Sequence, residues 1–350
     1  MKTLIEDYRN VPGKHCGSTA MKNLLSYYCN LELSEAEVFG LGSGPDFIYI
    51  SVEASEPPIL TLGRNMAMET DVCQALGIDY RETIDLDSEH AWSSVRQEIL
   101  EGRPTMLMGD SYYLDYRGFG SHHFAGHRFV LVGFNDETEQ AYVADRIEET
   151  IESCSYKALS ASRNPPLPTS SYNLWGKFHG TRVNKSIEEA LLTALAKASQ
   201  RMLGNDNFTQ CYMKMATASH DAQIATGVQG LELFYQEFMG WREIHNRTQI
   251  LGYSSNCIER FGNGGGNFRR LYAEFLQSSK SLLPDIIDDD MIQQSLNSAE
   301  AWTNLSQSLH QLSQNETDSQ WTACHAQIKT VLDTEQTLFE NIDSKLSNAN

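Results

Sequence analysis

The segment KHCGSTAMKNLL, residues 14–25, places a cysteine at the start of a helical stretch and shortly after a Pro-Gly break at residues 12–13. Unpaired backbone N–H groups and the positive end of a helix dipole stabilise a thiolate, which is the form of cysteine that attacks acyl carbons. His15, next to the cysteine, would add to this effect. We therefore interpret Cys16 as a candidate nucleophile. The alternative is a cysteine that merely precedes a helix.

A second segment, HRFVLVGF over residues 127–134, places a histidine directly before an apolar strand. A turn and a further strand follow, and that strand ends at Asp145. A carboxylate from a neighbouring strand holds an imidazole in one tautomer and stabilises it when it is protonated. A cysteine on a helix start, a histidine leading a strand and an aspartate on the next strand are the chain order of papain-like enzymes. We predict a Cys16, His127 and Asp145 triad.

The rest of the first 160 residues mixes helix and strand signals. We expect helices over residues 18–28, 72–76 and 91–100, a capped helix start at Ser34, and strands over residues 104–108, 129–132 and 141–144. This order predicts a helical half followed by an antiparallel sheet.

The proline-rich segment PPLPTSS, residues 165–171, is incompatible with regular structure, and we place a domain boundary near residue 160. From residue 186 onward, apolar residues recur at helical spacing. The predicted fold class is therefore α+β: a papain-like catalytic domain over residues 1–160, followed by a mainly α-helical accessory or substrate domain over residues 161–350.

Composition narrows the functional classes. The chain has 350 residues, 41% of them hydrophobic, and a formal net charge of −19, which argues against binding to nucleic acid or anionic membranes and favours cationic ligands. Seven scattered cysteines, none spaced Cys-x-x-Cys, predict neither disulfides nor a zinc knuckle. No signal-peptide or membrane-spanning pattern is evident, so we expect a cytoplasmic protein.

Several motifs resemble one family. The segments are HCGST at residues 15–19, SEAEVFGLGSG at 34–44, DSYYL at 110–114 and the strand that begins at His127. Together they resemble the N-terminal domain of the butirosin biosynthesis protein H family, and GNGGGNFRRLY at 262–272 is similar to the glycine-rich signature of its helical C-terminal region. The resemblance implies acyl transfer from an acyl carrier protein thioester to an amine, an aminoglycoside in the founding case, on a fold related to papain-like peptidases.

Further residues are expected to complete the site around the nucleophile. Asn10 precedes Cys16 by the interval at which papain-like peptidases carry an oxyanion-hole glutamine, so its amide is a candidate donor beside the Cys16 backbone N–H. An ordinary loop cap is the alternative for this asparagine. His15 and Gly17 belong to the same expected oxyanion and substrate-binding region.

The histidine cluster HHFAGH, residues 122–127, lacks acidic neighbours, so we predict no metal site there. His127 is preferred as the base because it leads the apolar strand, whereas His123 would lie off the strand. We assign His123 and Tyr113 to substrate binding.

Two glycine-rich segments lack nucleotide-binding context. Residues 40–44 are interpreted as a tight loop lining the cleft. Residues 262–266 are interpreted as a flexible loop that leads into a helix near Asn267 and closes over the acceptor. The candidate cations for docking an acidic carrier are Lys177, Arg182 and Lys185, or Arg269 and Arg270.

The leading functional hypothesis is a cysteine-dependent acyltransferase that moves an acyl group from an acyl carrier protein thioester, through a Cys16 acyl-enzyme, to a small amine or polyamine. No cofactor is expected, apart from the phosphopantetheine of the carrier. A cysteine amidase, peptidase or thioester cyclase with the same triad is the alternative, and a non-catalytic scaffold is a third class. The oligomeric state stays open, a homodimer included.

Overall fold

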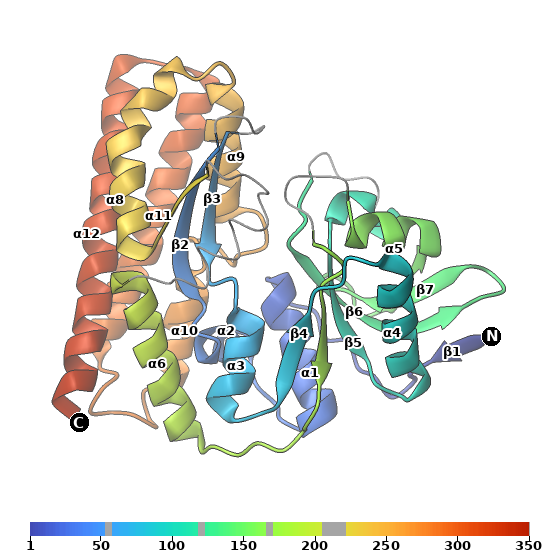
Figure 1. The fold of residues 1–350 in the computed structure, drawn as a ribbon. Coiled ribbons are helices and arrows are strands. Elements are labelled where there is room, and N and C mark those ends of the chain that lie inside the picture. Colours follow the sequence, from blue (N-terminus) through green and yellow to red (C-terminus); the bar gives the residue numbers. More distant parts are fainter. Residues whose placement is uncertain (53–57, 118–122, 166–170, 205–221, 350) are drawn as a thin grey trace. The chain divides into compact units, whose positions relative to one another are not determined.

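The computed structural model describes residues 1–52, 58–117, 123–165, 171–204 and 222–349 (Figure 1). These residues form two compact units that interleave along the chain. The sheet unit comprises residues 1–38 and 77–184, and the helical unit comprises residues 39–76 and the described chain from residue 185 onward.

The sheet unit is built on an antiparallel sheet of seven strands, in the order β4-β9-β5-β6-β7-β8, with β1 pairing with the far end of β6. Its elements are β1 (Lys2–Leu4), α1 (Cys16–Cys29), β4 (Tyr80–Thr83), α4 (Ser88–Leu100), β5 (Thr105–Gly109), the 3₁₀ turns η1 (Ser111–Tyr113) and η2 (Asp115–Arg117), β6 (His127–Asn135), β7 (Gln140–Ala144), β8 (Glu152–Ser155), α5 (Tyr156–Arg163) and β9 (Trp175–Phe178). Helix α2 (Glu35–Leu41) begins in this unit and ends in the helical unit.

Strand β6 is the centre of the sheet unit, because every one of its residues is buried. A strand covered on both faces reads as a continuous apolar run, which explains the sequence FVLV at residues 129–132. Helices α1 and α4 both contact β6. The helix that carries Cys16 therefore packs directly on the strand that begins with His127.

The helical unit combines long helices with a small antiparallel sheet in the order β10-β2-β3. Its elements are β2 (Pro45–Ser51), β3 (Ile59–Arg64), α3 (Met68–Leu76), α6 (Ile187–Leu203), β10 (Gln223–Thr226), α8 (Gly227–Glu237), the 3₁₀ turn η3 (Phe238–Glu243), α9 (Arg247–Glu259), α10 (Arg269–Ser279), α11 (Asp289–Gln314) and α12 (Asp318–Ala349). Phe47 and Tyr49 of β2 join Phe234, Trp241 and Trp302 in one apolar core, so the small sheet is part of this unit's interior.

The glycine-rich segment at residues 262–266 is a packed turn, which corrects the prediction of a flexible closing loop. The side-chain amide of Asn263 donates to the carbonyl oxygens of Cys257 and Ile258, at 2.6 and 2.7 Å. Gly266 has a φ of 56°, and a Cβ built on it would lie 2.7 Å from the carbonyl oxygen of Ala299 in α11. Glycine is required there because the backbone is left-handed and approaches α11 closely.

Arg269, predicted as a surface cation for carrier docking, is fully buried. Its guanidinium forms two hydrogen bonds to the Glu335 carboxylate, Nε to Oε1 at 2.7 Å and Nη2 to Oε2 at 2.9 Å. It also donates to the carbonyl oxygens of Gly63 and Asp46, at 2.8 and 3.0 Å. The arginine therefore ties α10, α12 and the small sheet together, and it is not available to a carrier protein.

The other cations predicted to dock a carrier protein differ in whether they contact other residues of the chain. Lys177 forms an ion pair with Glu98 at 2.6 Å, and the guanidinium of Arg270 donates to the hydroxyl of Thr303 at 3.1 Å. Lys185 donates to the carbonyl oxygen of Gln74 at 3.3 Å, whereas Arg182 is exposed.

The predicted α+β class is confirmed, with a sheet-containing N-terminal part and a helical C-terminal part. The single boundary near residue 160 differs from the structure, because β9 returns to the sheet unit between β4 and β5, and residues 39–76 leave it for the helical unit. Residues 166–170 of the proline-rich segment lie outside the described residues. The loop at residues 40–44 belongs to the helical unit, where it connects α2 to β2. None of the described helices combines the length and apolar character needed to cross a membrane.

Candidate functional site

Cys16 is the first residue of α1, and the local backbone explains why the helix begins there. His15 is the N-cap with an extended backbone, and its Nδ1 accepts the backbone N–H of Ser18 at 3.2 Å. In the described part of the chain, the backbone N–H groups of Cys16 and Gly17 have no acceptor. Because helix N-termini leave such donors unpaired, the thiol lies at the positive end of the α1 dipole.

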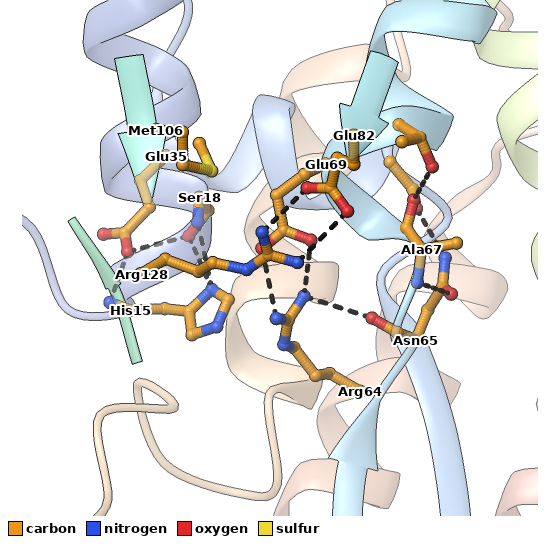
Figure 2. A network of polar contacts seen from close by, with 12 residues as sticks. His15, Ser18, Glu35, Arg64, Asn65, Ala67, Glu69, Glu82, Met106 and Arg128 are labelled. Atoms are coloured by element: carbon orange, nitrogen blue, oxygen red, sulfur yellow. Dashed lines mark hydrogen bonds and ion pairs between the residues drawn. The ribbon is translucent and has the colours of Figure 1, made fainter. Parts of the chain in front are cut away.

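Glu35 holds the segment that leads into Cys16 (Figure 2). Its Oε1 accepts the backbone N–H of His15 at 2.6 Å and the hydroxyl of Ser18 at 3.1 Å. Its Oε2 accepts the backbone N–H of Lys14 at 2.9 Å. Sequence analysis treated Glu35 only as part of a helix start, because nothing in its local sequence indicates a contact with residues 14–18.

His127 and Asp145 meet at one end of the sheet. Strand β6 begins at His127 and pairs with β7, and Asp145 directly follows β7. His127 Nε2 lies 2.9 Å from Asp145 Oδ2, and the imidazole also hydrogen-bonds the Cys16 thiol. Since Nε2 faces the carboxylate, Nδ1 is the nitrogen left for the sulfur. All three residues are buried.

Two residues that sequence analysis did not single out surround Asp145. The Tyr116 hydroxyl donates to Asp145 Oδ2 at 2.8 Å. Arg117 Nη1 lies 2.7 Å from the same oxygen and 2.8 Å from His127 Nε2. When His127 is an imidazolium, its Nε2–H donates to Asp145, and Arg117 is a nearby like charge. When the ring is neutral and Nε2 carries no proton, Nε2 accepts from Arg117. Arg117 thus favours the neutral form of His127.

These contacts favour a thiolate. Burial by itself raises the pKa of the Cys16 thiol, but hydrogen bonds from His127 and His15 outweigh burial and bring this pKa well below its ordinary value. Burial lowers the pKa of His127, whereas Asp145 and Cys16 raise it, and the net shift is upward. Burial raises the pKa of Asp145, but His127 and Arg117 hold it well below the usual range. Both shifts favour a thiolate–imidazolium pair over a neutral thiol and a neutral imidazole.

His15 is the second imidazole at the sulfur. Because Nδ1 accepts the N–H of Ser18, the proton of its neutral ring resides on Nε2, which leaves a donor for Cys16.

Asn10 has a different place from the one predicted. Its side-chain Nδ2 donates to the carbonyl oxygens of Asp145 and Glu148, at 2.8 and 2.6 Å, and its Oδ1 accepts from Asn23 at 2.9 Å. Both amide hydrogens are engaged, so in this geometry Asn10 fastens the segment after β7 to α1 and has no N–H to offer a substrate. The loop-cap interpretation describes these contacts better than an oxyanion donor does.

His123 and Tyr113 lie together, but in a separate cluster. His123 Nδ1 is 2.7 Å from Asp110 Oδ2, and the ring of Tyr113 lies 5.6 Å from the imidazole. His122 lies outside the described residues. Among the described side chains, no group of three or more His, Cys, Asp or Glu residues is arranged to hold a metal ion.

Two family models match the chain. "Butirosin biosynthesis protein H, N-terminal" matches residues 15–146, a span that begins at His15 and includes Cys16, His127 and Asp145. "Domain of unknown function (DUF4872)" matches residues 157–342, more than half of the chain. The chain belongs to the butirosin biosynthesis protein H-like family. The family name refers to the biosynthesis of butirosin, which is consistent with a biosynthetic enzyme of secondary metabolism. No curated protein matches the chain significantly.

In this member of the family, Cys16 should be the most reactive thiol at mildly acidic pH. Burial raises the pKa of Cys29 to about 11 and those of Cys257 and Cys324 to about 12, so these thiols stay protonated where Cys16 is ionised. At pH 6, iodoacetamide should label Cys16 at least ~100-fold faster than any of these three. Peptide mapping measures the rates, and labelling in denaturant is the control for intrinsic reactivity. Equal rates in the folded protein would contradict the assignment.

Arg117→Met should raise the pKa of His127. The substitution removes a cation beside Nε2 and frees Asp145 to interact with the imidazolium alone, and both effects favour the protonated ring. We expect the pKa of His127 to rise. NMR titration of isotope-labelled histidines measures the change, and the His127→Gln variant assigns the signal. Arg117→Lys retains the positive charge and is the matched control. An unchanged pKa of His127 in Arg117→Met would show that the charge of Arg117 does not influence the imidazole.

Proposed function

We propose that the chain is a cysteine-dependent acyltransferase that moves an acyl group from an acyl carrier protein thioester to an amine in secondary-metabolite biosynthesis. The observation that carries the proposal is the Cys16 thiol at the start of α1, hydrogen-bonded by the His127 imidazole, which in turn pairs with Asp145. Membership of the butirosin biosynthesis protein H-like family supports it.

In the first half-reaction, the Cys16 thiolate attacks the thioester carbonyl. A new carbon–sulfur bond forms to Cys16, and the bond to the phosphopantetheine sulfur breaks while His127 donates its proton to that sulfur. The backbone N–H groups of Cys16 and Gly17 are the donors proposed for the oxyanion, since they have no acceptor in the described part of the chain.

In the second half-reaction, a neutral amine attacks the acyl-enzyme. A carbon–nitrogen bond forms, the bond to the Cys16 sulfur breaks, and the amine proton passes to His127, which restores the thiolate–imidazolium pair. Asp145 keeps the imidazole oriented and stabilises it when it is charged. Glu35 and Asn10 act as positioning residues for the two sides of the site.

The proposed partners are the acyl carrier protein and a cationic amine or polyamine. The net charge of −19 favours a cationic acceptor but disfavours an acidic carrier away from a local basic patch. Since Arg269 is buried, that patch would have to use other cations, of which Arg182 is exposed. The proposal also places the protein in the cytoplasm and requires no cofactor besides the phosphopantetheine of the substrate.

Product analysis tests the proposal. The protein is incubated with a panel of acyl N-acetylcysteamine thioesters and with spermidine or an aminoglycoside, and the products are identified by mass spectrometry. We expect amides from the wild-type protein and none from Cys16→Ser. Release of free acid without amide would favour the hydrolytic alternative, an amidase or peptidase that uses the same residues. If neither amide nor free acid forms, thioester chemistry with these donors is refuted.

A further inference from the structure

A second aspartate–histidine pair lies at the same end of the sheet as His127. Gly109, the last residue of β5, pairs with His127, the first residue of β6, so Asp110 begins just beyond that pair. Antiparallel partners lie about 5 Å apart at Cα. The segment after β5 therefore starts beside the proposed catalytic base.

Asp110 is fully buried, and its two carboxylate oxygens have different partners. Oδ1 accepts the backbone N–H groups of Tyr112 and Phe124, at 3.0 and 2.8 Å. Asp110 thus holds together the residues that follow β5 and those that precede β6. Oδ2 contacts His123 Nδ1 at 2.7 Å. The backbone role needs only Oδ1, so the contact of Oδ2 with an imidazole calls for a different explanation.

His123 is oriented outward by this contact. Because Nδ1 faces Asp110, the ring presents Nε2, which has no partner within the described ranges. The side chain is 43% exposed, in contrast to 4% for His127. The rings of Tyr112 and Tyr113 flank the imidazole, at 4.1 and 5.6 Å between centroids. His123 Nε2 is therefore an accessible proton acceptor beside two aromatic rings.

The charge of the cluster suits an ammonium group. The cluster combines the Asp110 carboxyl group with the ring faces of Tyr112 and Tyr113, and aromatic faces attract cations. An ammonium bound beside the ring can pass a proton to Nε2, while Nδ1 keeps its contact with Asp110 Oδ2 at 2.7 Å. His15, Cys16 and His127, by contrast, are buried and contact one another.

We propose that Asp110 and His123, with Tyr112 and Tyr113, form the acceptor subsite, which binds the ammonium of the amine substrate and removes its extra proton. This proposal rests on the proposed acyltransferase function and assigns its second substrate. The protonated amine loses one proton to His123 Nε2 and becomes nucleophilic. It then attacks the acyl-enzyme, its second proton passes to His127, and His123 releases its proton to solvent.

Half-reaction kinetics of His123→Gln test the subsite. Cys16 is loaded with an acyl group from an N-acetylcysteamine thioester, spermidine is added, and amide formation and hydrolysis are followed separately. We expect amide formation to fall about 100-fold, with loading and hydrolysis unchanged. The loss should shrink at high pH, where spermidine carries less charge and needs no base.

The matched control is His90→Gln. His90 also pairs with an aspartate, Asp85, at 2.5 Å, but it is 72% exposed and lies at the start of α4. This variant should behave as wild type. Unchanged amide formation in His123→Gln, or an equal loss of loading, hydrolysis and amide formation, would overturn the proposal, the second outcome indicating a structural role.

A binding measurement separates this subsite from the chemistry. Spermidine should shift the NMR signals of His123 in the wild-type protein without any acyl donor, and His90 should not respond. If loading fails while this shift persists, the proposed function fails and the amine site stands. If loading and transfer proceed but the His123 signals do not respond to spermidine, the acceptor binds elsewhere.

Discussion

Cys16→Ala and His127→Ala should each lower turnover at least about 1,000-fold, because the first removes the atom that carries the acyl group and the second removes the proton shuttle. Both side chains make up only a small share of the buried contacts between α1 and β6, so the fold should persist. Circular dichroism checks this. Steady-state kinetics with the best thioester and amine pair measures the loss.

Asp145→Asn should lose less activity than either. The amide oxygen still accepts the Nε2 proton of His127, but the negative charge that stabilises the imidazolium is gone. His123→Ala should retain acyl loading. If His127→Ala retained full activity while His123→Ala lost loading, the two histidines would have exchanged roles, and the assigned base would be wrong.

Arg269→Met should destabilise the helical unit by roughly 3–5 kcal/mol, because it leaves the fully buried Glu335 carboxylate without its cation. Trp302 and Ser298 also donate to Glu335 Oε1, yet neutral donors do not replace the guanidinium. Urea unfolding followed by tryptophan fluorescence measures the change.

Two variants make this prediction specific. Arg270→Met removes a neighbouring arginine whose guanidinium donates a hydrogen bond to the Thr303 hydroxyl at 3.1 Å, and it should change stability by less than about 0.5 kcal/mol. The double variant Arg269→Met with Glu335→Leu should recover part of the loss, since it leaves no unpaired buried charge. Equal stability of Arg269→Met and Arg270→Met would contradict the role assigned to the buried pair.

The local motifs could be predicted from sequence because each is encoded by neighbouring residues. Cys16 at the start of α1 follows from a helix-start pattern, and His127 before an apolar run follows from strand periodicity. The meeting of His127 with Asp145 then follows from the pairing of two consecutive strands. Short connections make such pairs adjacent in space.

The excursion of the chain between the two units was not predictable in the same way. The run FIYI in β2 reads as an apolar segment of ambiguous type, and its pairing with β10 involves residues far along the chain. Strand β9 joins the sheet unit after a proline-rich segment that indicated a boundary. In both cases the partner, and not the local sequence, decides the unit to which the strand belongs.

The misassigned residues show the same limit. Arginine side chains are exposed in most folded proteins, and no feature of the local sequence indicates that Arg269 pairs with Glu335. The glycines at 262–266 suggested flexibility, whereas close packing against Ala299 requires a glycine at residue 266. Glu35, Tyr116 and Arg117 reach the site only through tertiary contacts.

The most direct test of the account is to trap the acyl group on the protein. Intact mass and peptide mapping after incubation with an acyl thioester, in the absence of amine, should show one acyl group on Cys16. The group should disappear when the amine is added, and Cys16→Ser should carry no thioester-linked, amine-labile group. An acyl group on another cysteine, or one on Cys16 that no amine or water removes, would contradict the proposal that Cys16 is the nucleophile of an acyltransferase.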